Sequence, residues 1–226
     1  MKALKFLLVI MLVLTFSPIF VFAKETLQEY DSKCNSYSKS RNSHCVAATH
    51  RFCSDPEAYR GGAGIIQEIK FHGFGVACFA PSKYSEVSLT NLTDLNPGCN
   101  DKSLSQHPAC VTAAYQWCTK TGNGNAGIVQ EVGNGVFGVA CINAKSYQDV
   151  SIGALVAIHP GCNSSEKSQE PDCVSAIHRW CVNNGKGNAG LAQETKSDVL
   201  GIACFQANWY GDVYLEPAPL PMGGGD

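Results

Sequence analysis

The sequence predicts an α+β protein of three tandem small disulfide-stapled modules, each a short helix followed by a three-stranded antiparallel sheet. Three observations predict this class. The 12 cysteines form three sets of four with nearly equal spacing. Between the second and third cysteine of each set lies a stretch rich in helix-compatible residues. After the third cysteine, glycine-rich turns separate short apolar segments that are typical of strands.

The cysteine spacing defines a tandem repeat. The intervals within the sets are 11, 8 and 25 residues, then 11, 8 and 23 twice, and both gaps between sets are 21 residues. Agreement of this kind indicates repeated copies of one unit. We therefore expect cysteine-rich repeats at 24–92, 93–155 and 156–217. The cysteines are Cys34, Cys45, Cys53, Cys78, Cys99, Cys110, Cys118, Cys141, Cys162, Cys173, Cys181 and Cys204.

The two ends of the chain are expected to lie outside the repeats. Lys2 and Lys5 precede an apolar run, and small residues up to Ala23 suit a signal peptidase, so residues 1–23 are predicted to be a signal peptide. An uncleaved anchor is the alternative, although Pro18 and the short apolar core favour cleavage. Residues 218–226 are rich in proline and glycine and are predicted to be disordered. These features predict a secreted, extracellular protein with no membrane span after signal cleavage.

The cysteines are expected to form six disulfides, because an even number follows an export signal. Zinc sites usually show closely spaced cysteine or histidine pairs, which this sequence lacks. The second and third cysteines are separated by about 12 Å of helix, beyond the ~7 Å that a disulfide bridges. We prefer first with second and third with fourth, because a hairpin would return the fourth to the helix end. First with third and second with fourth remains open.

The helix is predicted from its start signals and its apolar face. Pro108 and Pro171 suit a first helical position. On a helical wheel, one face carries the apolar residues of "CVSAIHRWC", and Ser175 and Arg179 are expected to point away from it. "GIVQEV" and "VFGVACI" then predict a hairpin, and "YQDVSI" a third strand. Because "YGDVYL" follows the last cysteine, we expect this segment to close its own module.

A Gln-Glu pair closes the first predicted strand of every module. Alternation along a strand places Gln67, Gln130 and Gln193 on the core face, as buried amides that pair with the backbone of the glycine-rich turn. The glutamates would then lie on the opposite face. Ligand binding at a surface site and a structural pair with Arg51 or Arg179 explain the glutamates equally well.

The repeated rings are expected to pack in the core. Tyrosine replaces histidine in the middle copy of one helical position, which favours packing over chemistry there. A second position carries Phe52, Trp117 and Trp180, for which packing is favoured over stacking on a sugar ring. The candidate ligand-binding residues are Glu68, Glu131, Glu194, Arg51, Gln116 and Arg179. Asn91 and Asn163 begin sequences that are acceptors for N-glycosylation.

Charge and motif content exclude several classes. Without Lys2 and Lys5, 15 basic residues stand against 19 acidic ones, a formal charge of −4, and the basic residues are scattered. Nucleic acid is therefore not an expected partner. The sequence has no G-x-S-x-G, H-E-x-x-H or P-loop motif and no unpaired cysteine. We expect no enzyme, no cofactor and no metal site.

The leading functional hypothesis is a secreted multivalent binding protein that recognises carbohydrate on a cell surface, cell wall or matrix. Repetition of weak sites raises avidity, which suits binding better than catalysis. Alternatives are a structural coat or matrix protein, and a secreted protease inhibitor. The inhibitor hypothesis rests on the first-module loop "SDPEAYRGG", which is two residues longer than its counterparts and is expected to expose Arg60. The ligand and the oligomeric state are not indicated.

Overall fold

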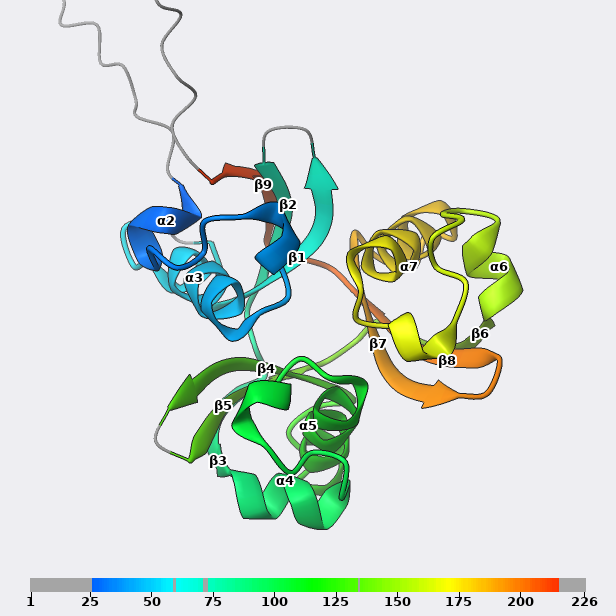
Figure 1. Ribbon diagram of the computed structural model, residues 1–226, viewed down its shortest axis with the longest axis horizontal. Helices are drawn as coiled ribbons and strands as arrows, with labels where there is room; N and C mark the ends of the chain where they lie inside the picture. The colour runs from blue at the N-terminus through cyan, green and yellow to red at the C-terminus, as the bar shows by residue number, and fades with distance from the viewer. Residues whose placement is uncertain (1–25, 59, 71–72, 134, 216–226) are drawn as a thin grey trace, which may run out of the picture.

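A computed structural model describes residues 26–58, 60–70, 73–133 and 135–215. The predicted signal peptide and the predicted tail at 218–226 lie outside these residues. Within them, helices combine with three three-stranded antiparallel sheets and six disulfides, which confirms the predicted class. Figure 1 shows three lobes around a common centre, each with one prominent helix.

The prominent helices are α3 (Ser43–Ser54), α5 (Pro108–Lys120) and α7 (Pro171–Asn183). Proline lies in the first turn of α5 and α7, as predicted. In α3, the side chain of Asn42 instead caps the helix by accepting a hydrogen bond from the amide of Cys45. The helix start is therefore encoded in all three copies, by two different devices.

A second, short helix precedes the first cysteine of each copy and was not predicted. These helices are α2 (Leu27–Tyr30), α4 (Leu89–Leu95) and α6 (Ile152–Val156). Each carries one fully buried leucine, namely Leu27, Leu92 or Leu155, which explains why leucine recurs seven residues before the first cysteine. A single 3-10 turn follows in each copy: η1 (Tyr37–Lys39), η2 (Lys102–Leu104) and η3 (Ser165–Lys167).

Each sheet has the second strand of a repeat at its centre. One sheet has the order β1-β2-β9, the second β3-β5-β4 and the third β6-β8-β7. The strands are β1 (Ala63–Lys70), β2 (Gly73–Phe79), β3 (Lys83–Ser88), β4 (Ala126–Gly133), β5 (Val136–Ile142), β6 (Ser146–Ser151), β7 (Ala189–Lys196), β8 (Val199–Phe205) and β9 (Trp209–Tyr214). We call lobe 1 the unit of α3, β1, β2 and β9, lobe 2 that of α5, β3, β4 and β5, and lobe 3 that of α7, β6, β7 and β8.

The third strand of each sheet comes from the preceding repeat, so the expectation that it closes its own module is wrong. β3 pairs with β5, and β6 pairs with β8. β9 returns to lobe 1 and pairs with β2, which closes the three lobes into a ring. Strand pairing needs only a free edge with a matching side-chain pattern, and the three central strands offer equivalent edges. Thr26 forms a parallel bridge with Tyr214 beside this closure.

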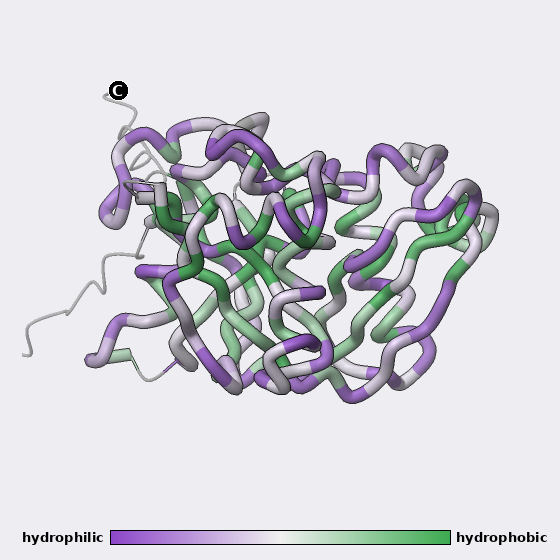
Figure 2. The backbone as a smooth tube through the Cα atoms, turned by 90° about the horizontal axis from the view of Figure 1, so that it is seen from below, coloured by the Kyte–Doolittle hydropathy of each residue, from purple (hydrophilic) through white to green (hydrophobic). Residues whose placement is uncertain are grey.

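The sheets separate two kinds of core. One face of every sheet contributes to a central core shared by all three lobes, which includes Ile65, Ile128 and Leu191. The other face packs on the helix and disulfides of its own lobe. Figure 2 shows the apolar segments running through the interior, with hydrophilic segments along the outer edges. The lobes therefore cannot separate without exposing the central core.

The disulfide pairing confirms the preferred alternative, first with second and third with fourth. The pairs are Cys34–Cys45, Cys53–Cys78, Cys99–Cys110, Cys118–Cys141, Cys162–Cys173 and Cys181–Cys204. The longer bridges close loops of 23 or 25 residues. Each of these should contribute on the order of 3 kcal/mol to the free energy of unfolding.

Candidate functional site at the lobe interfaces

The Gln-Glu pair lies at a β-bulge in each first strand. The pairing register shifts between Ile66 and Glu68, and at the same place in the other two copies. The extra residue is the glutamine, which is at most 1% exposed in all three copies. The bulge shifts the alternation by one, so Glu68 lies on the central-core face with Ile65. The expectation that the glutamates lie on the face of the strand opposite to the core is therefore wrong.

The buried glutamines hold the ring together. The amide of Gly64 donates to the side-chain oxygen of Gln130 at 2.8 Å, that of Gly127 to Gln193 at 2.6 Å, and that of Gly190 to Gln67 at 2.7 Å. The prediction of a buried amide that pairs with backbone is confirmed, but its partner lies in the first strand of a neighbouring lobe. Each lobe thus receives one such bond and gives one, as a closed ring requires.

Hydroxyl groups on two of the helices make further hydrogen bonds across the interfaces, to the backbone carbonyls of the buried glutamines. Thr112 on α5 donates to the carbonyl of Gln193 at 2.8 Å, and Ser175 on α7 donates to that of Gln67 at 3.4 Å. Ser175 is only 7% exposed, so the expectation that it points away from the packed face is wrong. Ser175 faces the neighbouring lobe. A helical wheel describes one helix alone and takes no account of such a neighbour. The equivalent residue on α3 is Ala47, which has no hydroxyl to donate.

Two aromatic rings stack across each interface. His50 lies on Tyr84 with ring centroids 5.0 Å apart, Tyr115 on Tyr147 at 5.4 Å, and His178 on Tyr210 at 5.0 Å. This confirms packing for the helical position shared by the two histidines and Tyr115. Burial lowers the pKa of His50 and of His178, although the nearby glutamates oppose this shift. Both histidines are therefore held in their neutral form.

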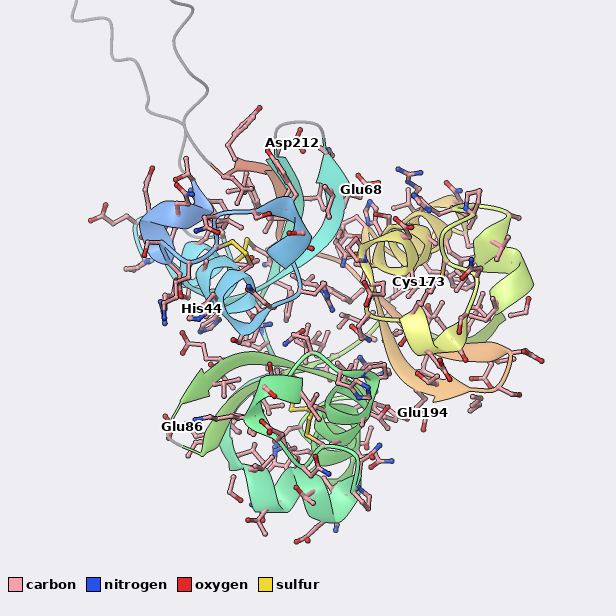
Figure 3. The ribbon with its side chains drawn as sticks, in the orientation of Figure 1. His44, Glu68, Glu86, Cys173, Glu194 and Asp212 are labelled. Carbon is pink, nitrogen blue, oxygen red and sulfur yellow. A yellow bond between two sulfur atoms is a disulfide. The ribbon has the colours of Figure 1, made fainter. Side chains whose placement is uncertain are left out.

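The candidate glutamates lie beside these rings. Glu68 and Glu131 contact the helix of a neighbouring lobe, whereas Glu194 contacts Tyr147 of its own sheet. Arg179 donates to Glu68 at 3.0 Å, and Arg51 donates to Glu131 at 3.1 Å. At the third interface Gln116 takes the arginine's position, and Glu194 accepts a hydrogen bond of 2.8 Å from Tyr147. Figure 3 shows Glu68 on the border of lobe 1 that faces lobe 3, and Glu194 on the border of lobe 3 that faces lobe 2. Pairing with arginine, one of the two explanations considered for the glutamates, is observed at two interfaces.

The three interfaces differ in how much of the glutamate they leave open. The side chain of Glu68 is 15% exposed, that of Glu194 is 30% and that of Glu131 is 36%. Lysine contributes to this difference. Lys70 lies 4.0 Å from Glu68 and Lys196 lies 3.9 Å from Glu194, whereas the equivalent residue near Glu131 is Gly133. The interface between lobes 1 and 2 is the most open of the three at this position.

A pocket of about 310 Å³ lies at the interface between lobes 1 and 2. We call it the 1–2 pocket. Its walls come from α2, α3 and the end of β4, and its lining residues are Asp31, Ser43, His44, Ala47, Arg51, Glu131, Val132 and Gly133. Arg51 and Glu131, which pair across the interface, therefore also face this space, and so does Ala47. A polar wall around a cavity of this size is suited to a small hydrophilic ligand.

Asp31 anchors the pocket wall on the lobe 1 side. Its carboxylate lies 3.0 Å from Nδ1 of His44 and 3.9 Å from Nη1 of Arg51. Burial on its own would raise the pKa of Asp31, but the hydrogen bonds from His44 and from the amide of Lys33 outweigh it and lower the pKa. Asp31 is therefore a fixed negative charge at neutral pH, and sequence reasoning did not single it out.

The structure also places the predicted core aromatics, the glycosylation acceptors and Arg60. Phe52 is buried, and Trp117 and Trp180 pack against the cores of their lobes, as predicted. Asn91 and Asn163 are exposed. The expectation that the first-module loop exposes Arg60 is wrong, because its guanidinium lies 3.9 Å from the ring centroid of Phe52 and donates to that residue's carbonyl. Beside Arg60 lies a second cavity, of about 360 Å³.

The described part of the chain contains no cluster of three or more His, Cys, Asp or Glu side chains arranged to hold a metal ion. In the same residues, no helix is long and apolar enough to cross a membrane. Comparison of the chain with family models, with curated proteins and with solved structures gives no match. The function must therefore be argued from the interfaces themselves.

Proposed function

We propose that this protein is an extracellular binding protein that recognises carbohydrate through polar groups at its lobe interfaces. The observation that carries the proposal is the repetition, at three equivalent edges, of a partly open carboxylate that accepts a side-chain hydrogen bond beside a stacked aromatic pair. Carboxylate, guanidinium and amide groups are the fixed acceptors and donors that sugar hydroxyls can match. Six disulfides are typical of a protein that folds in an oxidising compartment.

Binding is a better account of these edges than catalysis. The side chains with lowered or raised pKa are held by neighbours in structural roles: the neutral His50 and His178 lie stacked on tyrosines. Burial, together with Glu131 and Glu86, raises the pKa of Tyr84 to about 12, which keeps its hydroxyl protonated. Three similar edges on one rigid ring would add avidity toward a repeating polymer.

The test is retention of the mature, oxidised protein on insoluble polysaccharides and whole cell walls, followed by calorimetry with soluble oligosaccharides of the retained polymer. Variants must keep the ring intact, so Glu131→Gln and Gln116→Ala are preferred to changes at the more deeply buried Glu68. Glu166→Gln, at an exposed site on η3, is the matched control.

The proposal predicts retention of the protein and of the control, with weaker retention of the two interface variants. It also predicts tighter binding of a polymer than of its monosaccharide, because linked sites act together. Absence of retention on every polysaccharide, with the protein shown to be folded by its thermal transition, would contradict it.

A further inference from the structure

The interface between lobes 1 and 2 lacks a lysine that the other two interfaces contain. In lobe 1, Lys70 on β1 reaches across the sheet to Asp212 on β9, with Nζ 2.6 Å from the carboxylate. In lobe 3, Lys196 on β7 reaches Asp149 on β6 at 2.8 Å. Both ammonium groups also lie within 4.0 Å of the interface glutamate of the same sheet. Two of the three copies thus place a primary ammonium between two carboxylates.

The same two carboxylates are present in lobe 2 without the ammonium. Glu131 on β4 and Glu86 on β3 face each other across Gly138, as Glu68 and Asp212 do across Gly75. The lysine position is Gly133, and a Cβ built there meets no atom within 4 Å. Glu86 is exposed and takes part in no hydrogen bond or ion pair with any described residue. Figure 3 shows Glu86 and His44 on the same side of the molecule, on either side of the 1–2 interface.

The vacant lysine position opens onto the 1–2 pocket. Gly133 and Glu131 line that pocket together with Asp31, whose counterparts at the other two interfaces are Asn96 and His159. Two further substitutions enlarge the space, because Ala47 replaces a threonine or serine and Ser43 replaces proline. These four departures from the repeat, at positions 31, 43, 47 and 133, therefore fall around one cavity, and they combine to add a carboxylate and remove a cation.

From these observations we propose that a ligand held in the 1–2 pocket places a protonated primary amine at the Gly133 edge of the pocket, beside Glu131 and toward Glu86, which lies outside the pocket lining, where the other copies hold a lysine ammonium. A cavity of about 310 Å³ is at the lower end of small-molecule sites, ~300–1,000 Å³, so it accommodates one sugar residue rather than an extended ligand. The ligand class is an amino-sugar residue whose amine is not acetylated. The amine follows from the charges of the site, and the sugar rests on the proposed function.

The remaining groups of the pocket suit the rest of such a residue. Ser43 and His44 on α3 offer a hydroxyl and an imidazole edge, and Arg51 offers donors beside Asp31. These are neutral or paired groups, which match ring hydroxyls better than a second charge. An N-acetyl group would remove the positive charge that Glu131 and Glu86 attract, so acetylation should abolish the preference.

The experiment is calorimetry of the mature, oxidised protein with a fully deacetylated glucosamine tetramer and with its N-acetylated counterpart, at neutral pH, where the buried interface histidines stay uncharged. The key variant is Gly133→Lys, which supplies the lysine of the other copies within the chain. Gly153→Lys is the matched control, because a Cβ there also meets nothing within 4 Å and the residue lies in α6 of another lobe. Glu86→Gln removes one carboxylate without removing an interface contact. A lysine-containing tripeptide serves as an amine that carries no sugar.

The proposal predicts binding of the deacetylated tetramer at one site per chain, at least tenfold tighter than the acetylated tetramer and weaker in added salt. Gly133→Lys should reduce its affinity at least tenfold with no loss of thermal stability, Glu86→Gln should weaken it severalfold, and Gly153→Lys should leave it unchanged. Equal binding of both tetramers would overturn the amine inference and leave the carbohydrate function standing. Undiminished binding to Gly133→Lys would overturn the location. Binding of the tripeptide alone, or binding of no ligand, would overturn the amino-sugar assignment, whereas the carbohydrate function is overturned only if the protein is also retained on none of the polysaccharides.

Discussion

The interface between lobes 3 and 1 and the interface between lobes 1 and 2 share one frame and differ in what surrounds it. In both, a buried glutamine accepts from a glycine amide across the interface, a histidine stacks on a tyrosine, and an arginine pairs with a glutamate. The 3–1 interface adds Ser175 and Lys70, and the 1–2 interface has Ala47 and Gly133 in their places. The shared contacts are those that build the ring, and the differences create the 1–2 pocket. The repeated contacts thus mark the frame, and the departures from the repeat mark the pocket.

Removal of β9 should have the largest effect, because it breaks the frame that the interfaces share. A chain that ends at Asn208 loses Val213 and Leu215 from the core of lobe 1, and burial of each such side chain stabilises by about 1.5–3 kcal/mol. It also loses the strand that completes the sheet of lobe 1. We expect it to fail to form a stable monomer, as measured by urea unfolding and size exclusion. A chain that ends at Leu215 is the control, and an unchanged unfolding midpoint in the shorter chain would refute ring closure.

Substitution of the buried glutamines should come next and should separate the two interfaces. Gln67→Ala leaves both the amide and the carbonyl of Gly190 without their side-chain partner, whereas Gln130→Ala affects only the amide of Gly64. An unsatisfied buried group costs about 1–3 kcal/mol, so Gln67→Ala should lower the free energy of unfolding more than Gln130→Ala does. Urea unfolding of both variants measures this. If Gln130→Ala lowered the free energy of unfolding more than Gln67→Ala does, these hydrogen bonds would not determine the stability of the two interfaces.

Acidification should weaken the two interfaces that contain histidine and spare the third. The pKa values of His50 and His178 lie below the ordinary value near 6.5, so their contribution to stability is complete above about pH 6.5 and is lost as the pH falls through their folded-state pKa. The double variant His50→Tyr/His178→Tyr copies the Tyr115 arrangement. Its melting temperature should fall less than that of the parent protein between about pH 7 and pH 5. If the melting temperatures of the two proteins fell equally with pH, the buried histidines would not be the cause of the loss of stability in acid.

The smallest effect should come from the exposed ion pairs. Arg51 and Arg179 have side chains that are 48% and 49% exposed, and pairs of this kind contribute about 0–1 kcal/mol. Arg179→Met should be the more destabilising change, because its partner Glu68 is less exposed than Glu131, the partner of Arg51. Matched thermal melts of Arg179→Met and Arg51→Met measure the difference. A loss of several kcal/mol from either variant would show that these residues do more than tether the lobes.

The sequence predicted the parts of the fold that local rules control. Cysteine spacing and helix geometry excluded one pairing of the cysteines, and the preferred one of the remaining two is observed. The repeated prolines and glycines led to the helices and hairpins. Exchange of the third strand was missed because β6 matches the edge of its own repeat as well as that of the next one. The face of the glutamates was missed because a bulge at Gln130 changes the alternation and leaves no periodic signal.

The candidate residues lie at the lobe interfaces, an arrangement that the sequence did not predict. Arg51, Glu131 and their counterparts were chosen because they recur, and the structure brings them together across interfaces that no single repeat contains. Asp31 and Gly133 were overlooked because they break the repeat. A comparison of the three copies position by position would have marked both residues, since lysine stands at 70 and 196 where glycine stands at 133.

Hydrogen exchange of the mature, oxidised protein tests the closed ring most directly. The measurement is the protection of backbone amides in β9 relative to β3 and β6, the two strands exchanged inside the chain. Ring closure predicts that residues 209–214 are protected to a similar degree as 83–88 and 146–151, because all three are edge strands in equivalent sheets. Exchange of 209–214 at the rate of an unfolded peptide, with the other two strands protected, would show three lobes in an open row and would contradict the account.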